Sequence, residues 1–423
     1  MSASPSSEAV SEAARAARAA APSLAAAPAK TIDEALRGMA RRLGGGARDA
    51  ILAANQEDQA AARAGGMSGG LLDRLKLDEA RLTAMAAQLD ILAEVEAEPA
   101  QRTIRTLDGG LVLQEWRRPV GVIGANYEAR PNVTVDVASQ LVKSQNAGVL
   151  RTGSAALASA VALMDAVVAP ALADAGLDPA AVQLVRAKGR DSAEALVSQP
   201  GLIPLVILRG SGDSTRSLAE RAALHGVRTL AHADGGGVLY LDEAADPAKA
   251  AALIDAGLDR LGVCNRLNLL LVHQAIWDAT VPGVVDTLAA RTPAIAASLP
   301  PHSHALGYEW ALDSAGEATV TIAPVSGVQE AARIANDETS GLAAGIVTES
   351  TAAAREFLAA YAGTGAFWNA TTRLLDGFKL LALPETGINI DRVPGPRGPV
   401  TFRDLSLRQY VVVPADRAAD LGA

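Results

Sequence analysis

The chain has little of several residue types, and each scarcity excludes a class of protein. It contains one cysteine in 423 residues, which excludes an intrachain disulfide framework and a cysteine-based metal cluster. Lysine and arginine together number 38, against 47 aspartates and glutamates. The resulting net charge of −9 argues against general binding to nucleic acids or anionic membranes. No uninterrupted apolar run reaches the roughly 18 residues of a membrane span. We therefore expect a soluble protein of the cytoplasm.

The composition predicts aliphatic cores in more than one domain. Hydrophobic residues make up 49% of the chain, whereas aromatic residues make up 3%. A chain of this length is too long for one ordinary core, which favours two α/β domains and a small additional element. The five histidines are scattered, and His302 and His304 lie among prolines that indicate a surface loop. We therefore expect no metal site.

Strands and helices alternate along most of the chain. Residues 1–29 are rich in alanine, serine and proline and are expected to be largely disordered, apart from a helix at about 8–20. A hairpin is expected at about 102–116, and a second α/β series from residue 227. Strands of the first series are expected at 120–124, 146–151, 182–186 and 205–208. This alternation predicts doubly wound parallel sheets, with ligands at the carboxyl ends of the strands.

The single cysteine, Cys264, follows Gly262 and precedes a run of leucine and valine that predicts a buried strand. A thiol in such a turn is well placed to be a nucleophile, because the turn leaves backbone N–H groups to hold an oxyanion. A free cysteine is also often a small buried hydrophobic residue. The turn alone slightly favours that second interpretation.

Two turns of small residues follow predicted strands and are candidate phosphate sites. One is Arg151-Thr-Gly-Ser154, and the other is Arg209-Gly-Ser-Gly-Asp-Ser214. Free N–H groups and the dipole of a following helix favour an anion at such a turn. Neither matches the G-x-G-x-x-G fingerprint. A plain strand-to-helix turn explains the second more economically, and a surface ion pair explains Arg151 equally well.

A third turn, Tyr127-Glu-Ala-Arg-Pro-Asn132, places three polar side chains together at the end of a buried strand. Groups of this kind are costly there unless they meet a ligand or one another, which favours a functional role. The glycine-rich stretch at 232–237 suits either close backbone approach or a linker between domains. Glu385 lies in Leu383-Pro-Glu-Thr-Gly387, which by itself indicates a surface turn.

These segments, in this order, resemble the gamma-glutamyl phosphate reductases (glutamate-5-semialdehyde dehydrogenases) of the aldehyde dehydrogenase superfamily, over residues 13–412. The most specific match is Tyr127-Glu-Ala-Arg-Pro-Asn-Val-Thr-Val-Asp-Val-Ala-Ser139. Shorter matches are Leu72-Asp-Arg-Leu75, His232-Ala-Asp-Gly235, Arg260-Leu-Gly-Val-Cys-Asn265 and Arg397-Gly-Pro399. In that family the cysteine that matches Cys264 is the nucleophile.

The resemblance implies an α/β, aldehyde dehydrogenase-like fold with a Rossmann-like cofactor domain, an α/β catalytic domain and a small β element for oligomerisation. The expected NADP-binding domain spans residues 30–226, with the hairpin contributing to oligomerisation. The expected catalytic domain spans 227–390. Residues 391–423 are expected to form a loop and an oligomerisation strand. The expected partners are a small-molecule substrate and further copies of the chain, with functional coupling to glutamate 5-kinase.

The resemblance also implies a reaction and a role for each site residue. Cys264 would attack gamma-glutamyl phosphate, phosphate would leave, and NADPH would reduce the thioester to glutamate 5-semialdehyde in proline biosynthesis. The oxyanion would be held by the Cys264 N–H and Asn132. The amino acid head of the substrate would contact Glu128, Arg130 and Asn265. The cofactor would contact Arg151, Gly153, Ser154, Gly210, Ser211, Gly212 and, at the nicotinamide ribose, Glu385.

The sequence departs from the family pattern at several of these places. The family has Glu and Thr where this chain has Asn268 and Leu269, and a glycine-rich run where it has Leu380-Leu-Ala-Leu-Pro-Glu385. Ile334–Gly345 is more similar to general aldehyde dehydrogenases. These departures leave open a different acyl phosphate or aldehyde as substrate. A catalytically silent homologue is a third hypothesis, which the retained Cys264 and Asn265 disfavour.

Overall fold

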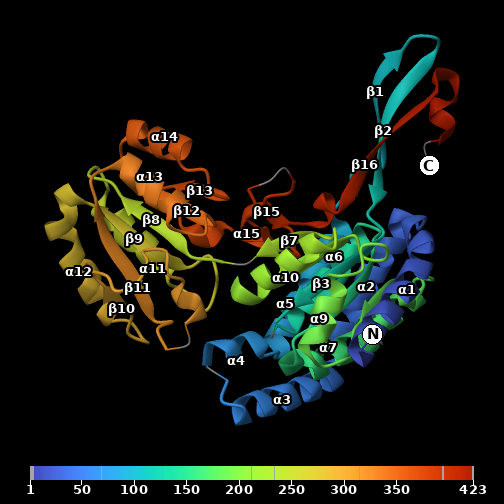
Figure 1. Ribbon diagram of the computed structural model, residues 1–423, viewed down its shortest axis with the longest axis horizontal. Helices are drawn as coiled ribbons and strands as arrows, with labels where there is room; N and C mark the ends of the chain where they lie inside the picture. Colours follow the sequence, from blue (N-terminus) through green and yellow to red (C-terminus); the bar gives the residue numbers. More distant parts are fainter. Residues whose placement is uncertain are drawn as a thin grey trace.

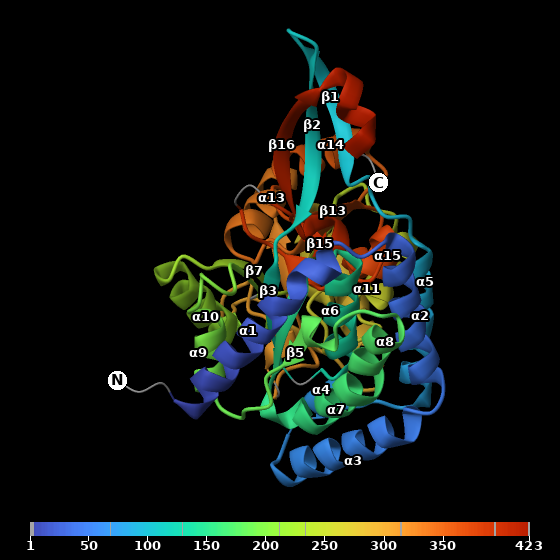
Figure 2. The ribbon, with the colours of Figure 1, turned by 90° about the vertical axis from the view of Figure 1, so that its right-hand side faces the viewer.

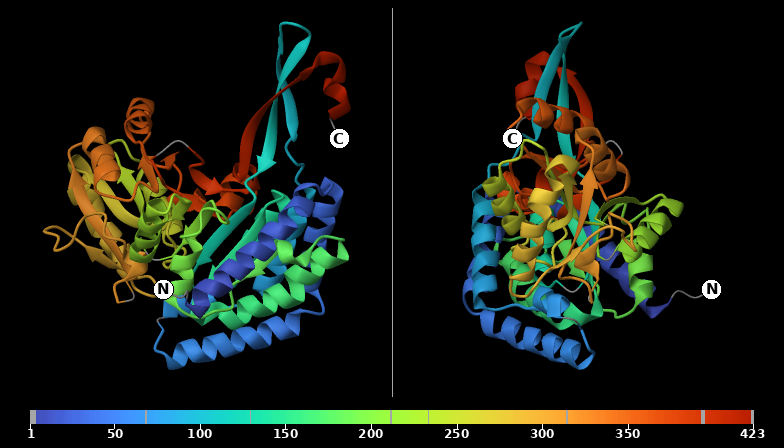
Figure 3. Two further views of the ribbon diagram at one scale, coloured as in Figure 1. Left: turned by 45° about the vertical axis from the view of Figure 1, so that its right-hand side comes forward. Right: turned by 90° about the vertical axis from the view of Figure 1, so that its left-hand side faces the viewer.

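The computed structural model describes residues 4–67, 69–128, 130–210, 212–232, 234–313, 315–392 and 395–421. Within these ranges the chain forms two α/β bodies, and a three-stranded antiparallel sheet projects away from both of them (Figure 1). The same projection is visible from two further sides in Figure 3. The predicted α/β architecture is confirmed.

The first body is a parallel sheet in the order β5-β4-β3-β6-β7, with helices on both faces. Its strands are β3 (Val122–Tyr127), β4 (Ala147–Thr152), β5 (Val182–Leu184), β6 (Leu205–Arg209) and β7 (Arg228–His232). Side chains alternate between the faces of a strand. In β3, Ile123 and Ala125 therefore join the core under α2 (Ala29–Gly44), α5 (Glu79–Glu94) and α6 (Asn132–Lys143), whereas Val122 joins a core on the opposite face.

The remaining helices of the first body complete these two layers. They are α3 (Arg48–Ala64), α4 (Gly69–Leu75), α7 (Leu157–Leu163), α8 (Ala169–Asp174), α9 (Arg190–Leu196) and α10 (Gly212–Leu224). Strand β7 pairs in parallel with β6. The first sheet thus extends a few residues past the division that the sequence predicted between residues 226 and 227.

The N-terminal segment corrects a prediction. The helix expected at about 8–20 is confirmed, but it is longer, α1 (Pro5–Ala25), so the expectation that residues 1–29 are largely disordered is wrong. Val10, Ala14, Ala17 and Leu24 recur every three to seven positions along it, and each is at most 1% exposed. Such spacing is a helical apolar stripe, and its small alanines let α1 pack on β4 and α9 (Figure 2). The alanine-rich composition concealed this stripe.

The second body is a parallel sheet in the order β10-β11-β9-β8-β12-β13. Its strands are β8 (Gly237–Leu241), β9 (Leu267–His273), β10 (Ala296–Ser298), β11 (Thr319–Val325), β12 (Ala343–Val347) and β13 (Gly365–Trp368). One face packs on α13 (Val328–Asp337) and α14 (Thr351–Ala360), and the other on α11 (Pro247–Gly257) and α12 (Trp277–Ala289). A short helix, α15 (Gly377–Leu381), follows β13.

The projecting sheet joins the predicted hairpin to the C-terminal strand. Strands β1 (Gln101–Leu107) and β2 (Leu111–Pro119) are the hairpin, and β16 (Ser406–Pro414) pairs antiparallel with β2 over its whole length. A separate pair, β14 (Gly387–Asn389) and β15 (Gly398–Val400), precedes β16. Leu407, Tyr410 and Val412 in β16 are each more than half exposed.

One helical stretch bears on the expectation that no segment of the chain spans a membrane. Ser154–Asp174 is long and apolar enough to cross a bilayer by length and composition, but 56% of its most apolar window is buried inside the protein. Leu163, Val167 and Leu172 from this stretch belong to the core of the first body. A buried core helix passes the same test, so the stretch is weak evidence for a membrane span.

Candidate active site

The predicted nucleophile lies where the two sheets approach each other. Strand β7 ends at His232 and β8 begins at Gly237, so a short connection runs from the carboxyl edge of the first sheet to the amino edge of the second. Cys264 lies just before β9, the neighbour of β8. The Gly236 N–H donates to the Cys264 carbonyl at 2.6 Å, and the Gly237 N–H donates to the Arg266 carbonyl at 2.7 Å. These bonds fix the cysteine turn against the 235–237 segment.

The surroundings of Cys264 keep its thiol protonated at neutral pH. The side chain is half-buried and packs against an apolar cluster that includes Leu342, Phe367 and Leu375. Burial raises the pKa of the thiol to about 11, and the nearby charge of Arg130 works in the opposite direction. Since a thiolate is the reactive form of cysteine, the site must remove this proton or stabilise its loss.

A carboxylate that the sequence analysis missed, Glu309, lies on the other side of the same turn. Its Oε2 accepts the Gly235 N–H at 2.8 Å. A β-carbon added to Gly235 would stand 2.5 Å from Glu309 Oε1 and 2.7 Å from the β-carbon of Cys264. The negative charge of Glu309 helps to raise the pKa of the thiol. Only a glycine fits between these two groups.

Asn268 holds the segment that carries Glu309. Its buried amide donates to the Tyr308 carbonyl at 2.7 Å and accepts the Trp310 N–H at 3.0 Å. The two bonds therefore bracket Glu309 on both sides. The amide supplies both a donor and an acceptor, whereas the ionised glutamate of the family pattern would offer acceptors only. No local pattern in the sequence signals the pairing.

The structure separates Glu128 and Arg130, which the sequence analysis placed together at the substrate. Arg130 lies near Cys264 and Arg209, and burial lowers the pKa of its guanidinium to about 9. The Glu128 carboxyl instead packs on Gly210, where an added β-carbon would stand 2.9 Å from it. The same carboxylate acts on the charge of Arg151. Glu128 therefore belongs to the edge expected to bind the cofactor.

Neither predicted asparagine makes a side-chain hydrogen bond to Cys264 in the part of the chain that the structure describes. The Asn132 amide donates to Asp136 Oδ2 at 2.9 Å, one turn further along α6. The Asn265 amide is buried, donates to the Leu375 carbonyl at 2.9 Å and accepts a hydrogen bond from Arg373. Asn265 thus anchors the turn of Cys264, and its expected role as a substrate contact stays a prediction.

The residues expected to bind the cofactor gather at the carboxyl edge of the first sheet. Gly153 and Ser154 follow β4, and Gly210 and Gly212 lie between β6 and α10, with β3 between the two turns. Ser211, also predicted here, lies outside the described residues. Helix α10 begins at Gly212, so its first N–H groups are at this edge. A helix amino terminus, a cation and glycines together fit a phosphate-bearing cofactor.

The side chain of Arg151 is held at this edge by hydrogen bonds to residues of the first body. Its guanidinium donates to Asn126 Oδ1 at 3.1 Å, to Ser192 Oγ at 3.2 Å and to the Gly189 carbonyl at 2.8 Å. Glu385 lies on the Cys264 side. It accepts the Gly377 N–H at 2.9 Å, and its charge raises the pKa of the thiol. The carbonyl of the next residue, Thr386, accepts a hydrogen bond from Arg209 at the end of β6 at 3.0 Å.

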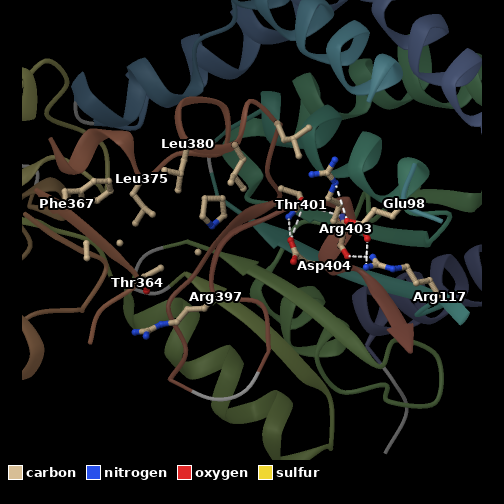
Figure 4. A pocket seen from close by; sticks show the side chains of 16 residues that line it. Glu98, Arg117, Thr364, Phe367, Leu375, Leu380, Arg397, Thr401, Arg403 and Asp404 are labelled. Carbon is tan, nitrogen blue, oxygen red and sulfur yellow. Dashed lines mark hydrogen bonds and ion pairs between the residues drawn. The ribbon is translucent and has the colours of Figure 1, made fainter. Parts of the chain in front are cut away.

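A cavity of about 650 Å³ lies behind this site, between the second body and the base of the projecting sheet (Figure 4). Phe367 and Leu375, from the apolar cluster against which Cys264 packs, form part of its wall. Arg397 also lines it and donates to the Ala362 carbonyl at 2.9 Å. Cys264 does not line this cavity.

Comparison with known proteins places this arrangement in a family. The family model described as "Aldehyde dehydrogenase family" matches residues 2–297. A gamma-glutamyl phosphate reductase from Clavibacter michiganensis is 37% identical over 409 residues, which is 94% of this chain and 92% of that protein. One from Sphingopyxis alaskensis is 38% identical over 85% of this chain and 84% of its own length. The chain belongs to the gamma-glutamyl phosphate reductase branch of the aldehyde dehydrogenase family.

Solved structures agree with this placement. The gamma-glutamyl phosphate reductase of Thermotoga maritima superposes with a TM-score of 0.85 at 28% identity, over 96% of this chain and 98% of that one. An acetylating aldehyde dehydrogenase from Geobacillus thermoglucosidasius, at 15% identity, has a TM-score of 0.72 over 96% of this chain and 97% of its own. This second likeness shows the fold alone. The predicted aldehyde dehydrogenase-like fold and family are confirmed.

Proposed function

We propose that this chain reduces L-glutamyl 5-phosphate to L-glutamate 5-semialdehyde and phosphate through a thioester on Cys264, with NADPH as cofactor, in proline biosynthesis. The observation that carries the proposal is the turn of Cys264, which is bonded to Gly236 and lies between Arg130 and Glu309. The reductases related to this chain at 37–38% identity are named for the same reaction, so a different substrate is the less favoured alternative.

Different residues at the turn can supply the nucleophile and the positive charge that the first step requires. The Cys264 sulfur attacks the acyl carbon, the C–O bond to phosphate breaks, and the thiol proton leaves on the departing phosphate. Arg130 and Arg209 place positive charge beside the sulfur, where it stabilises both a thiolate and an anionic phosphate. Because an acyl phosphate is already activated, the protein mainly supplies position and charge. The Cys264 N–H and the Asn132 amide are the candidates for holding the oxyanion.

Bound NADPH would supply the hydride that reduces the thioester. Gly153, Ser154, Gly210 and Gly212 would hold its phosphates, with Arg151 as the nearby cation. Glu385 would hold the nicotinamide ribose from the Cys264 side. When the carbon–sulfur bond breaks, the sulfur takes a proton back and the aldehyde is released. We also propose that the enzyme works in the cytoplasm, in functional coupling with glutamate 5-kinase, which would limit the lifetime of a reactive acyl phosphate.

The projecting sheet supports a proposal that the enzyme is a homo-oligomer. Strand β16 is an unpaired edge of its sheet and carries exposed apolar side chains. Such an edge promotes aggregation unless another chain covers it. Leu407 and Tyr410 are 53% and 59% exposed. A charged residue at both positions is expected to reduce the molecular mass in solution, measured by light scattering, without changing the far-ultraviolet circular dichroism.

The reverse reaction tests the catalytic proposal. Wild type and Cys264→Ala are supplied with glutamate 5-semialdehyde, phosphate and NADP⁺, and NADPH absorbance is followed. The proposal expects phosphate-dependent NADPH formation that the variant lacks, while both proteins bind NADP⁺. Turnover of other aldehydes but not of this one would move the chain to the alternative substrate. Absence of both turnover and NADP⁺ binding would indicate a silent homologue.

A further inference from the structure

Two segments that match the family pattern, and that the proposed reaction does not use, lie next to each other beside the turn of Cys264. They are Leu72–Leu75 in α4 and the stretch that begins at Arg260. Arg260 pairs with Asp73 at 3.0 Å. Arg74 donates from Nε to the Gly262 carbonyl at 3.0 Å. Helix α4 of the first body is therefore fastened to the turn that carries Cys264.

A cavity of about 300 Å³ lies where these segments meet. It is lined by Gly70, Asp73, Arg74, Leu258, Asp259, Arg260, Leu261, Gly262, Arg291, Thr292, Pro293, Ile295 and Glu317. Three of these side chains are arginines and three are carboxylates, so both signs of charge converge on one small space. A site of this kind suits a ligand that itself carries both charges.

The Glu317 carboxylate lies between the two segments. An added β-carbon would stand 2.5 Å from its Oε2 at Gly70 and 2.8 Å from its Oε1 at Gly262. Both glycines therefore allow the carboxylate to reach the cavity wall. Arg74 uses Nε and one terminal nitrogen on the carbonyls of Gly262 and Ala311. Among the described residues, its other terminal nitrogen makes no hydrogen bond.

The cavity is close enough to Cys264 to hold the far end of a short substrate. Gly262 lines the cavity two residues before Cys264, and two residues span at most about 7 Å. Three carbons separate the acyl carbon of a glutamyl group from its α-carboxylate, which is a comparable length. Arg130, beside the sulfur, also feels the charges of Arg74 and Arg260, so positive charge continues from the nucleophile to the cavity.

We propose that this cavity is the subsite for the α-amino acid end of the substrate. Arg74 and Arg260 would face its α-carboxylate, since guanidinium groups bind carboxylates in a planar, bidentate manner. Glu317 would face its α-ammonium group. The inference rests on the proposed function and moves the amino acid head away from Glu128 and Arg130. Arg130 is then left for the phosphate and the sulfur.

The test uses three acids of five carbons that compete with alkylation of Cys264 by iodoacetamide. L-glutamate carries both α groups, and glutarate lacks the ammonium group. Pentanoate lacks both when its single carboxylate lies at Arg130, as the carboxylate at the reacting end would. Wild type is expected to be protected in that order. Arg74→Gln should abolish the preference for glutarate over pentanoate, and Glu317→Gln the preference for L-glutamate over glutarate. Each loss should be on the order of 10–100-fold, the range for removing a hydrogen bond to a charged group.

Arg42→Gln is the matched control, because Arg42 lines a different cavity of about 420 Å³ and should change neither preference. Equal protection of wild type by all three acids would overturn the inference, as would variants that fold normally and keep both preferences. Thermal unfolding checks that each variant still folds. Arg74→Gln and Glu317→Gln are compared with wild type separately, so each tests the inference without the other. Phosphate-dependent turnover of the semialdehyde without any preference would leave the proposed function standing and reject the subsite. Protection in the order L-glutamate, glutarate, pentanoate without turnover of the semialdehyde would support the subsite and reject the proposed function.

Discussion

The two sheet edges that meet at the candidate active site are built differently. At the carboxyl edge of the first sheet, Arg151 is held by Asn126 and Ser192, at most 41 positions away along the chain. At the amino edge of the second sheet, the turn of Cys264 is held by Arg74, which bonds to Gly262 across 188 positions, and by segments on either side of it. The Arg151 turn is thus a local structure, whereas the turn of Cys264 is assembled from distant segments. The second predicted cofactor turn is intermediate, because Arg209, which precedes it, donates to the Thr386 carbonyl at 3.0 Å across 177 positions.

This difference predicts that an added methyl group lowers kcat more at the turn of Cys264 than at a cofactor turn. Two glycines, one at each edge, test the prediction. In Gly235→Ala the added carbon would lie 2.7 Å from both the β-carbon and the carbonyl oxygen of Cys264, and backbone cannot move aside. In Gly210→Ala the added carbon would meet only the end of the Glu128 side chain, at 2.9 Å, which can rotate away.

We expect Gly235→Ala to lower kcat by about 100-fold or more, the effect of misplacing reacting groups by roughly 1 Å. Gly210→Ala should change mainly the KM for the cofactor, by a few-fold. Steady-state kinetics of both variants, beside wild type, measure this. Equal losses of kcat in the two variants would show that the two edges are equally rigid.

The next largest effect is expected at Asn265. Replacement by alanine leaves the Leu375 carbonyl and the Arg373 guanidinium without the buried amide that they contact. An unsatisfied buried polar group costs about 1–3 kcal/mol of the free energy of unfolding. Urea denaturation should detect this loss together with a fall in activity. Thr372→Val removes only a hydroxyl that donates to the Asn265 carbonyl at 2.9 Å and should be milder. A destabilised but fully active Asn265→Ala would contradict the anchoring role.

Local signals in the sequence were enough for the fold, but not for the nucleophile or its partners. Apolar runs separated by helical stretches predict parallel strands wherever they occur, whereas the turn of Cys264 by itself slightly favours a small buried hydrophobic residue, and only the family resemblance indicates a nucleophile. Asn265 was assigned to the substrate because it follows Cys264, yet its amide points to 373–375. Spacing along a turn does not determine the direction of a side chain. Glu309 lies in an irregular segment before β11, and only folding brings it to Gly235.

A smaller effect is expected at Asn268, which tests whether the carboxylate beside Cys264 must be held in place. Asn268→Asp keeps an acceptor for the Trp310 N–H but loses the donor to the Tyr308 carbonyl. We expect kcat to fall by less than in Gly235→Ala, with little change in the KM for the cofactor. Asn268→Ala removes both bonds and should have the larger effect of the two. A change confined to the cofactor KM would place this segment at the cofactor edge instead.

The smallest expected change is a shift in the ionisation of Cys264, and it separates the two charges that flank the sulfur. Glu309 raises the pKa of the thiol and Arg130 lowers it, while burial accounts for most of the rise to about 11. Because the thiolate is the form that reacts with iodoacetamide, the alkylation rate rises with pH up to the thiol pKa. Glu309→Gln should move that rise to lower pH, and Arg130→Gln to higher pH. Arg151→Gln, at the other edge, should leave it unchanged. A shift of the same sign in the two flanking variants would mean that burial, and not charge, controls the nucleophile.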